Sequence, residues 1–201
     1  MSTGASNVRR SKASERKISQ YLLTLTGKKF RRRRVEGRNE HTIAVESTGD
    51  VIPIDGKFKF NIECKIERGF SFDAILKSDK SLFSGWWTQC LEDCILAEKI
   101  NGQKTHPMLI FRPANNQEWI AITECVLGDL VHLIDGQKRP KSITIDLCGE
   151  DLVTKCKPII QMLPKDEHNK PIWLNMPNPV LFRTKEFEQS YRISENAFYQ
   201  R

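Results

Sequence analysis

The stretch GDVIPIDGKFKFNIECKIERG, residues 49–69, decides the predicted fold, because it alternates apolar and polar residues around a tight turn. Such alternation is typical of β-strands that bury one face, and the dipeptide Asp55-Gly56 favours a two-residue hairpin turn. We therefore predict a β-hairpin in which Val51 lies opposite Phe60. Its apolar face is predicted to comprise Val51, Pro53, Phe58, Phe60, Ile62, Cys64 and Ile66.

The polar face of the predicted hairpin carries two acids and a base. The same register places Asp50 opposite Asn61, so that Asp50, Glu63 and Lys65 share one side. Two carboxylates about 4 Å apart repel by about 4 kcal/mol at an effective dielectric constant of about 20, and a proton or cation between them removes this cost. Oxygen ligands without Cys or His suit Mg²⁺ or Mn²⁺. The pattern therefore predicts a metal site for phosphodiester hydrolysis, with Lys65 supporting the attacking water or the phosphate charge. The alternative is a solvated strand face with an ordinary salt bridge.

Asp55 is an alternative to Asp50 as the first carboxylate of this site. The hairpin turn explains an Asp at this position through backbone geometry alone. The prediction therefore favours Asp50.

The six cysteines are a weaker metal signal. Cys90 and Cys94 are spaced one helical turn apart, but no CxxC pair and no second pair with zinc-finger spacing accompanies them. We therefore expect free thiols in a reducing compartment.

The composition suits a folded chain. Of its 201 residues, 39% are hydrophobic and 28% are charged. No apolar run approaches the roughly 20 residues that span a bilayer, and the N-terminus lacks the apolar centre of a secretory signal. We therefore expect a cytoplasmic protein without a membrane partner. The sequence lacks a P-loop, a dinucleotide-binding glycine pattern and G-x-S-x-G, which argues against those enzyme classes.

Positive charge is concentrated near the N-terminus. The formal net charge is +7, yet residues 1–40 alone carry twelve Lys and Arg against three Glu, which leaves −2 on the rest. Such a patch favours a polyanion such as DNA, contacted through phosphates rather than bases. The alternative is a solvated charge run or a localisation tag. The candidate phosphate-binding residues are Lys28, Lys29, Arg31, Arg32, Arg33, Arg34 and Arg38.

Helix and strand patterns alternate along the chain, which predicts an α/β fold. Gly27 is a stop signal for the first helix, Ser84 is a candidate N-cap for the second, and Asn101-Gly102 is its predicted end. Beside the hairpin, the predicted helices are 12–26, 85–99 and 124–134, and the predicted strands are 28–34, 107–112, 118–123 and a run within 142–148.

The composition of the sequence changes after Asp135, since six of the nine prolines lie beyond this residue. We therefore predict a flexible basic arm (1–10), a core (11–135) and a C-terminal extension of unassigned role (136–201).

The order of these motifs resembles the PD-(D/E)XK nuclease superfamily. There, an Asp begins one strand and E-x-K follows on the next, as Asp50 and Glu63-Cys64-Lys65 do here. The short Ser/Gly loop before the Asp and the basic segment after the first helix are most similar to archaeal and phage Holliday-junction resolvases.

The resemblance covers residues 12–125 and has two departures. Gly49 stands where the superfamily has a proline before the Asp, and Val51 differs from many relatives. Neither position is a ligand.

The resemblance implies a small central mixed β-sheet flanked by helices, the restriction-endonuclease-like core. It also implies that Asp50, Glu63 and the backbone carbonyl of Cys64 bind Mg²⁺ or Mn²⁺, and that Lys65 assists the water.

Two helical residues join the candidate site through the resemblance alone. Relatives often add an acid from the first helix, and Glu15 is the candidate here. Gln89 falls where some relatives place a polar residue of the site. The alternative for both is an exposed helical residue.

The resemblance further implies a homodimer, because two symmetric cuts in a four-way junction need two active sites. Phe83, Trp86 and Trp87 are either its apolar contact or part of the core. We expect a metal-dependent DNA endonuclease that acts on branched DNA in recombination or repair. The alternatives are a nuclease for duplex or single-stranded DNA in repair or restriction, and a DNA-binding protein without catalysis.

Overall fold

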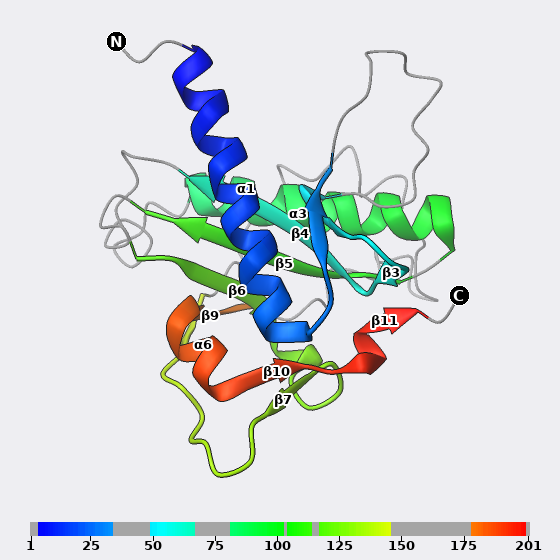
Figure 1. Ribbon diagram of the computed structural model, residues 1–201, viewed down its shortest axis with the longest axis vertical. Helices are drawn as coiled ribbons and strands as arrows, with labels where there is room; N and C mark the ends of the chain where they lie inside the picture. Colours follow the sequence, from blue (N-terminus) through cyan, green and yellow to red (C-terminus); the bar gives the residue numbers. More distant parts are fainter. Residues whose placement is uncertain are drawn as a thin grey trace, which may run out of the picture.

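The centre of the computed structural model is a mixed five-stranded β-sheet, and the structure describes residues 4–33, 49–66, 81–102, 104–113, 117–145 and 178–199 (Figure 1). β4 and β5 are parallel, whereas every other neighbouring pair in this sheet is antiparallel. The predicted α/β class with a small mixed sheet is therefore confirmed. In the order of the sheet, the strands are β4 (Phe60–Ile66), β5 (His106–Arg112), β6 (Trp119–Thr123), β9 (Pro179–Arg183) and β8 (Ile143–Thr144).

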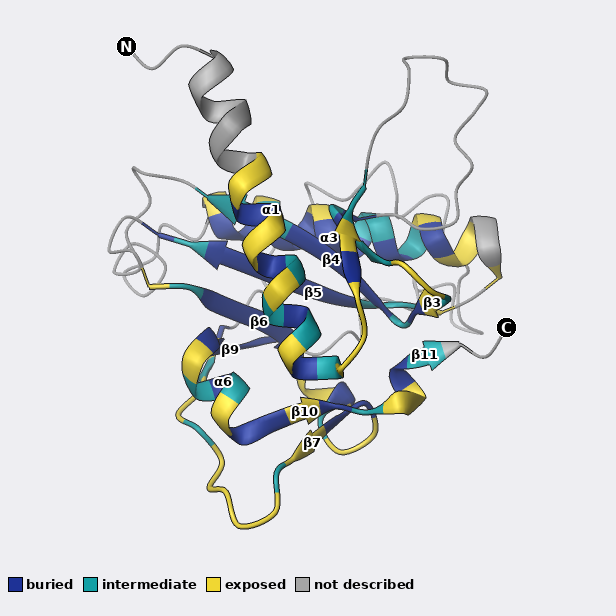
Figure 2. Cartoon of the chain, in the orientation of Figure 1, coloured by how far each residue is buried: buried dark blue, intermediate teal, exposed yellow. Residues whose placement is uncertain are grey.

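In the part of the chain that the structure describes, helices cover both faces of this sheet (Figure 1). α1 (Gly4–Thr26) and α6 (Thr184–Ser190) lie on one face, and α3 (Ser81–Asn101) lies on the other. Alternate residues of β5, β6 and β9 therefore belong to different cores, and these strands are largely dark blue between partly yellow helices in Figure 2.

β5 shows this division most clearly. Met108 and Ile110 pack with the side chains of α1, whereas Leu109 and Phe111 pack under α3. Both faces of the strand are buried, because a parallel partner on one side and helices above and below leave no solvated face.

The predicted hairpin is wrong in its pairing. β2 (Val51–Pro53) pairs antiparallel with β1 (Phe30–Arg32), so that Val51 lies opposite Arg32 and not opposite Phe60. The predicted faces of β4 are nevertheless correct, since Phe60 and Ile62 enter the core under α1.

The cause of this difference lies at Asp50. Its backbone N–H donates to the carbonyl of Ile62 at 2.8 Å, but its own carbonyl accepts from the N–H of Arg33 at 2.9 Å. The next N–H of β4, that of Cys64, donates to the side chain of Asp50 instead of to a backbone carbonyl. The side chain thereby ends the backbone pairing of this segment with β4, and β2 pairs with β1 instead.

The predicted helices 12–26 and 85–99 are confirmed, with corrections at their starts. α1 ends at Thr26 before Gly27 as predicted, but it begins at Gly4. α3 begins at Ser81, so Ser84 is a buried residue inside the helix and not its N-cap. It ends at Asn101, followed by Gly102 at a φ of 64°.

The strands predicted at 107–112 and 118–123 are confirmed as β5 and β6, but the helix predicted at 124–134 is wrong. This segment forms a short 3-10 turn, Glu124–Val126, and then strand β7 (Val131–Leu133). Val126, Leu130 and Val131 are buried, and their spacing imitates a helical stripe. Gly128, with a φ of 100°, reverses the chain between them.

The segment 136–201 contributes to the structure at several points. β8 and β9 belong to the central sheet, and β10 (Tyr191–Ile193) pairs with β7. β11 (Phe198–Tyr199) pairs with β3 (Lys57–Phe58), beside the turn of the predicted hairpin.

No helix in the described part of the chain is long and apolar enough to span a membrane.

We expect Leu22→Ala to lower the free energy of unfolding by about 2–5 kcal/mol, because Leu22 is fully buried between α1 and the sheet. Urea denaturation measures this change. The matched control is Leu96→Ala on α3, which should change stability by less than about 0.5 kcal/mol because this side chain is 45% exposed. Equal effects of the two substitutions would contradict the packing described here.

Candidate active site

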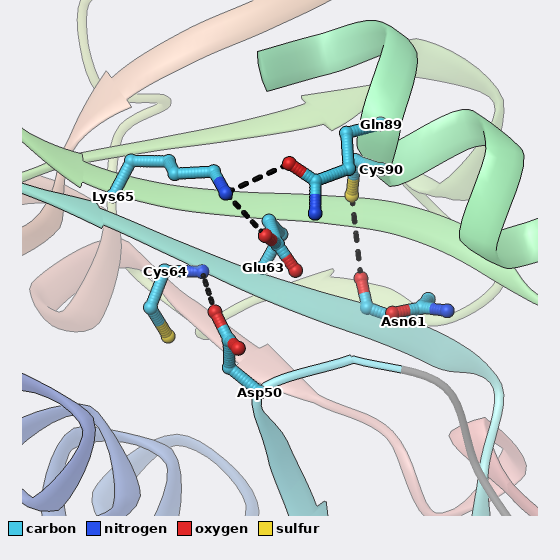
Figure 3. A network of polar contacts seen from close by, with 7 residues as sticks. All are labelled: Asp50, Asn61, Glu63, Cys64, Lys65, Gln89 and Cys90. Carbon is cyan, nitrogen blue, oxygen red and sulfur yellow. Dashed lines mark hydrogen bonds and ion pairs between the residues drawn. The ribbon is translucent and has the colours of Figure 1, made fainter. Parts of the chain in front are cut away.

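Glu63 and Lys65 lie on the side of β4 that faces α3. Glu63 is only 3% exposed. The Nζ atom of Lys65 is 2.5 Å from Oε1 of Glu63 and donates a hydrogen bond to Oε1 of Gln89 at 2.8 Å (Figure 3). Gln89 comes from α3, so the helix that buries Glu63 also orients the lysine. This face is therefore the floor of a polar site and not the solvated surface that an exposed hairpin would have.

Asp50 approaches the same strand from its edge (Figure 3). Its Oδ2 atom accepts a hydrogen bond from the backbone N–H of Cys64 at 2.9 Å. Cys64 lies between Glu63 and Lys65 in the sequence, so the carboxylate of Asp50 is held beside both of them. The structure thus brings together Asp50, Glu63 and Lys65, the three residues of the predicted metal site.

Gly49 allows the backbone to pass this close to β4. Its φ is 98°, and a Cβ atom would meet Oδ1 of Asn61 and would lie 2.9 Å from the carbonyl oxygen of Ile62. Proline fixes φ near −65°, which this backbone cannot adopt. The replacement of the superfamily's proline by glycine therefore has a local steric reason.

The two carboxylates influence each other's protonation. The pKa of Glu63 is raised to about 7, first by desolvation and then by the charge of Asp50, and Lys65 opposes this rise only in part. A buried carboxyl beside a second carboxylate resists ionisation, and a cation between the two would relieve both effects.

Asp93 is an acidic residue near this site that the sequence analysis did not name. It lies on α3 one turn after Gln89. Desolvation raises its pKa, the charge of Arg33 lowers it, and the charges of Asp50 and Lys65 raise and lower it, respectively. The i, i+4 spacing of Gln89 and Asp93 on the helix after E-x-K was the available signal.

Glu15 lies on the opposite side of β4, in the core-facing part of α1. It is 8% exposed, and its Oε2 atom is 3.4 Å from Nε of Arg32. Desolvation raises the pKa of the Cys64 thiol, and the charges of Asp50, Glu63 and Glu15 raise it further. Glu15 is therefore a buried, ion-paired residue near the site and not an exposed helical one.

The described basic residues of the predicted phosphate-binding patch lie along and around β1, and the N–H of Arg33 at one end donates to the carbonyl of Asp50 at 2.9 Å. At the other end, the carbonyl of Lys29 accepts from the N–H of Ile54, and the Nζ atom of Lys28 is 3.9 Å from Oε1 of Glu195. Arg31 and Arg32 belong to β1, the partner strand of β2, and Arg33 follows directly. Lys28, Lys29 and Arg31 are exposed. The predicted contacts Arg34 and Arg38 lie outside the described residues.

Asp55 is not brought to this site, whereas Cys90 lies next to it and its thiol donates to the backbone carbonyl of Asn61 at 3.6 Å (Figure 3). Asp55 is exposed in the bend after β2, and Cys90 and Cys94 are buried thiols of α3. Phe83 and Trp87 are buried in the core under α3. Trp86 is partly buried against the same core.

The donor atoms of the site fit a hard divalent cation. Asp50 and Glu63 supply carboxylate oxygens, and Cys64 supplies a backbone carbonyl, which are oxygen ligands of the kind that Mg²⁺ and Mn²⁺ take. Within the described ranges, no group of three His, Cys, Asp or Glu side chains forms a complete metal cage. Water or phosphate oxygens would therefore fill the remaining positions, as is usual for Mg²⁺.

We expect Gly49→Ala to lower the free energy of unfolding by more than Gly128→Ala does. Both glycines have φ near 100°, where an added Cβ strains the backbone by about 1–3 kcal/mol. Only at Gly49 would the new atom also collide with β4, since no atom lies within 4 Å at Gly128. Urea denaturation of both variants separates the effect of the collision from that of backbone strain. Equal losses of unfolding free energy in the two variants would show that the close approach of Gly49 to β4 is not needed.

We expect the stability of the metal-free protein to fall as the pH rises from about 4.5 to 7. The folded pKa of Glu63, about 7, lies above its ordinary value of 4.5, so its contribution is complete below pH 4.5 and is lost through pH 7. The loss is roughly 3 kcal/mol and should be absent in Glu63→Gln. Urea denaturation in EDTA at several pH values measures it, with Glu98→Gln, an exposed change on α3, as the control.

Urea denaturation at pH 8 with Mg²⁺ in place of EDTA should show that the cation stabilises the wild type and Glu98→Gln but not Glu63→Gln. Parallel pH curves of wild type and Glu63→Gln would contradict the buried, repelled state of this carboxyl.

A family model described as phage putative PDDEXK endonuclease matches residues 7–156. This segment contains α1 from Asn7 onward, Asp50 and the whole of β4 with Glu63 and Lys65. No curated protein and no solved structure matches the chain in the corresponding comparisons. The resemblance to the PD-(D/E)XK superfamily, which rests on Asp50 and Glu63-Cys64-Lys65, is confirmed at this level. The chain belongs to the family of phage putative PDDEXK endonucleases.

Proposed function

We propose that this protein is a Mg²⁺- or Mn²⁺-dependent DNA endonuclease that cuts branched DNA, as a Holliday-junction resolvase. The single observation that carries the hydrolytic part is the convergence of Asp50 and Glu63 on the two sides of the Cys64 peptide, with Lys65 on Glu63. Two repelling carboxylates beside an amine have no use in a surface that only binds phosphates. This argues against the alternative of DNA binding without catalysis.

Asp50, Glu63 and the backbone carbonyl of Cys64 would hold the metal ion. A bound divalent cation supplies neutralisation of phosphate charge and a more acidic water. The protein's own contribution is the placement of these ligands, because the hydrogen bond from the Cys64 N–H holds Asp50 at the strand edge while α3 shields Glu63 from solvent.

Lys65 is the candidate for handling the attacking water or the charge that develops on the phosphate. Its Nζ atom has three hydrogens, and the structure gives it Glu63 and Gln89 as partners. In this proposal Gln89 is a positioning residue, which keeps the amine above the site instead of in solvent.

Glu15 would act through Arg32. The ion pair between them connects α1 to β1, which carries the basic patch next to Asp50. Lys29 and Arg31 are exposed and are available for phosphates, and Lys28 is exposed beside Glu195, 3.9 Å away. Arg32 and Arg33 continue this surface towards the site. Arg34 and Arg38, which follow in the sequence, belong to the same proposal.

The preference for branched DNA and the homodimer rest on the similarity of the loop before Asp50 and of the basic segment to resolvases. A four-way junction has two-fold symmetry, and paired cuts need two copies of the site. The site of action would then be the cytoplasm of a bacterium or of the host cell of a phage, where recombination and repair take place.

We expect the purified protein to nick a labelled four-way junction symmetrically in Mg²⁺, and to leave it uncut in EDTA. Glu63→Gln should reduce cleavage by about 10²-fold or more while junction binding persists, because only the metal ligand is altered. Glu98→Gln, which makes the same chemical change at an exposed position of α3, should cleave as the wild type does.

A linear duplex with the same arm sequence serves as the matched substrate. Equal cutting of junction and duplex would overturn the resolvase assignment and favour a nuclease for ordinary DNA. Cutting in EDTA would overturn the metal mechanism, and binding without any cutting would favour the non-catalytic alternative.

A further inference from the structure

A second basic surface lies away from the candidate metal site, towards the opposite edge of the central sheet. An open groove of about 980 Å³ separates the loop 136–142 from the start of β6, the end of β9 and α6. The loop follows β7 and runs past α6 in Figure 1, and most of it is exposed in Figure 2. The basic residues that the structure describes between 28 and 33 are not part of this lining, so the groove is separate from the surface that they form along β1.

The side chains that line this groove are predominantly cationic. Lys138, Arg139 and Lys141 are exposed on the loop, and Arg183 faces them from the end of β9. Glu186 is the acid in the lining, and its Oε1 atom is 3.6 Å from Arg183. The three loop cations have no ion pair with a carboxylate in the part of the chain that the structure describes.

Arg183 is held in place by its surroundings. Its guanidinium carbon lies 5.7 Å from the ring centre of Trp119, which is buried in the core under α3. A guanidinium over an aromatic ring, with a carboxylate at its side, has few alternative positions, and its remaining N–H groups suit a phosphate. The groove therefore combines one arginine packed on Trp119 with three exposed cations.

The sheet register connects this groove to the candidate active site. Lys65 pairs with Phe111, Phe111 with Trp119, and Trp119 with Arg183. Residues paired in this way form one row across a sheet and point to the same face. Lys65 of the site and Arg183 of the groove therefore lie on one face and at one level of the sheet.

The length of this row matches a short stretch of DNA. Three strand spacings of about 4.8 Å separate β4 from β9, which gives about 14 Å. At a rise of about 3.4 Å for each nucleotide of one strand, this distance corresponds to about four nucleotides. A DNA strand that is cut at the candidate site beside Lys65 and that continues along the end of the sheet would reach the groove.

We propose that this groove binds the sugar-phosphate backbone of the DNA substrate about four nucleotides from the cut bond, through Lys138, Arg139, Lys141 and Arg183. The inference rests on the proposed endonuclease function for its ligand and adds a second contact, built by the C-terminal part of the chain. The groove offers cations rather than an apolar surface, which favours phosphates over a protein partner.

The test compares two triple variants that remove the same charge from exposed positions. The groove variant is Lys138→Gln/Arg139→Gln/Lys141→Gln. The control variant is Lys57→Gln/Lys99→Gln/Lys104→Gln, whose positions are exposed and lie outside the groove. Both are assayed by fluorescence anisotropy with a labelled linear duplex and a four-way junction, with Ca²⁺ in place of Mg²⁺, over a range of KCl concentrations.

We expect the groove variant to bind both DNAs at least about ten-fold more weakly at moderate salt than the control variant does. The slope of log affinity against log salt should decrease by about 0.9 for each phosphate contact that is lost. If the groove variant and the control variant bind DNA with equal affinity, the proposal is overturned. The alternative occupant of the groove is then an acidic protein segment.

A second measurement locates the contact on the DNA. Neutral methylphosphonates are placed one at a time along the strand whose cut site has been mapped with Mg²⁺. A substitution about four nucleotides from the cut should weaken binding of the wild type but not of the groove variant. Equal weakening in both proteins would overturn the assignment of the groove to that phosphate.

These outcomes separate the groove from the proposed activity. If the groove variant loses DNA binding and the wild-type protein cuts no DNA, the DNA-binding role of the groove is supported and the nuclease function is overturned. If the wild type cuts DNA in a metal-dependent way and the groove variant binds DNA as the control variant does, the nuclease function is supported and the DNA-binding role of the groove is overturned.

Discussion

The hydrogen bond from the N–H of Cys64 to the carboxylate of Asp50 is the contact on which the site and its surroundings depend. It places the first carboxylate at the edge of β4, next to Glu63. It also occupies the N–H that a neighbouring strand would need, so β2 cannot extend its pairing with β4. The carbonyl of Asp50 instead accepts from Arg33, and β2 pairs with the arginine-rich strand β1. One side chain thus creates the acidic site and brings the basic strand beside it.

Helix α3 links the stability of the core to the chemistry of the site. Trp87 and Leu91 fill the core on this face of the sheet, while Gln89 on the same helix holds the amine of Lys65. Covering the sheet in this way buries Glu63 and raises its pKa to about 7. The protein therefore keeps a carboxyl in an environment that disfavours its charge, a local destabilisation that is common where a cation or a substrate is to be bound.

The C-terminal part of the chain is connected to the site through the central sheet. β9 lies between β6 and β8 and carries Arg183 on the same row as Lys65. Because strand spacing is nearly constant, the sheet acts as a rigid spacer between the edge where the acids converge and the edge where the second group of cations lies. A substrate that contacts both ends would be aligned by the backbone of the sheet.

The parts of the fold that depend on local patterns could be predicted from the amino-acid sequence. Period-two alternation predicted the two faces of β4, helical spacing predicted α1 and α3, and the motif of Asp50 with Glu63-Cys64-Lys65 predicted the acidic site and the superfamily. These succeed because side-chain periodicity and turn residues act over a few neighbouring positions.

The pairing of the strands and the contacts between distant residues could not be predicted in this way and became visible in the folded chain. The turn at Asp55-Gly56 favoured a regular hairpin, yet the side chain of Asp50 competed with the backbone for the edge of β4 and redirected β2 to β1. Asp93 approaches the site, and Arg183 shares the row of Lys65, because helix packing and sheet order bring together residues far apart in the chain. Such contacts depend on long-range competition for hydrogen-bonding groups and buried surface, and no local pattern in the sequence records its outcome.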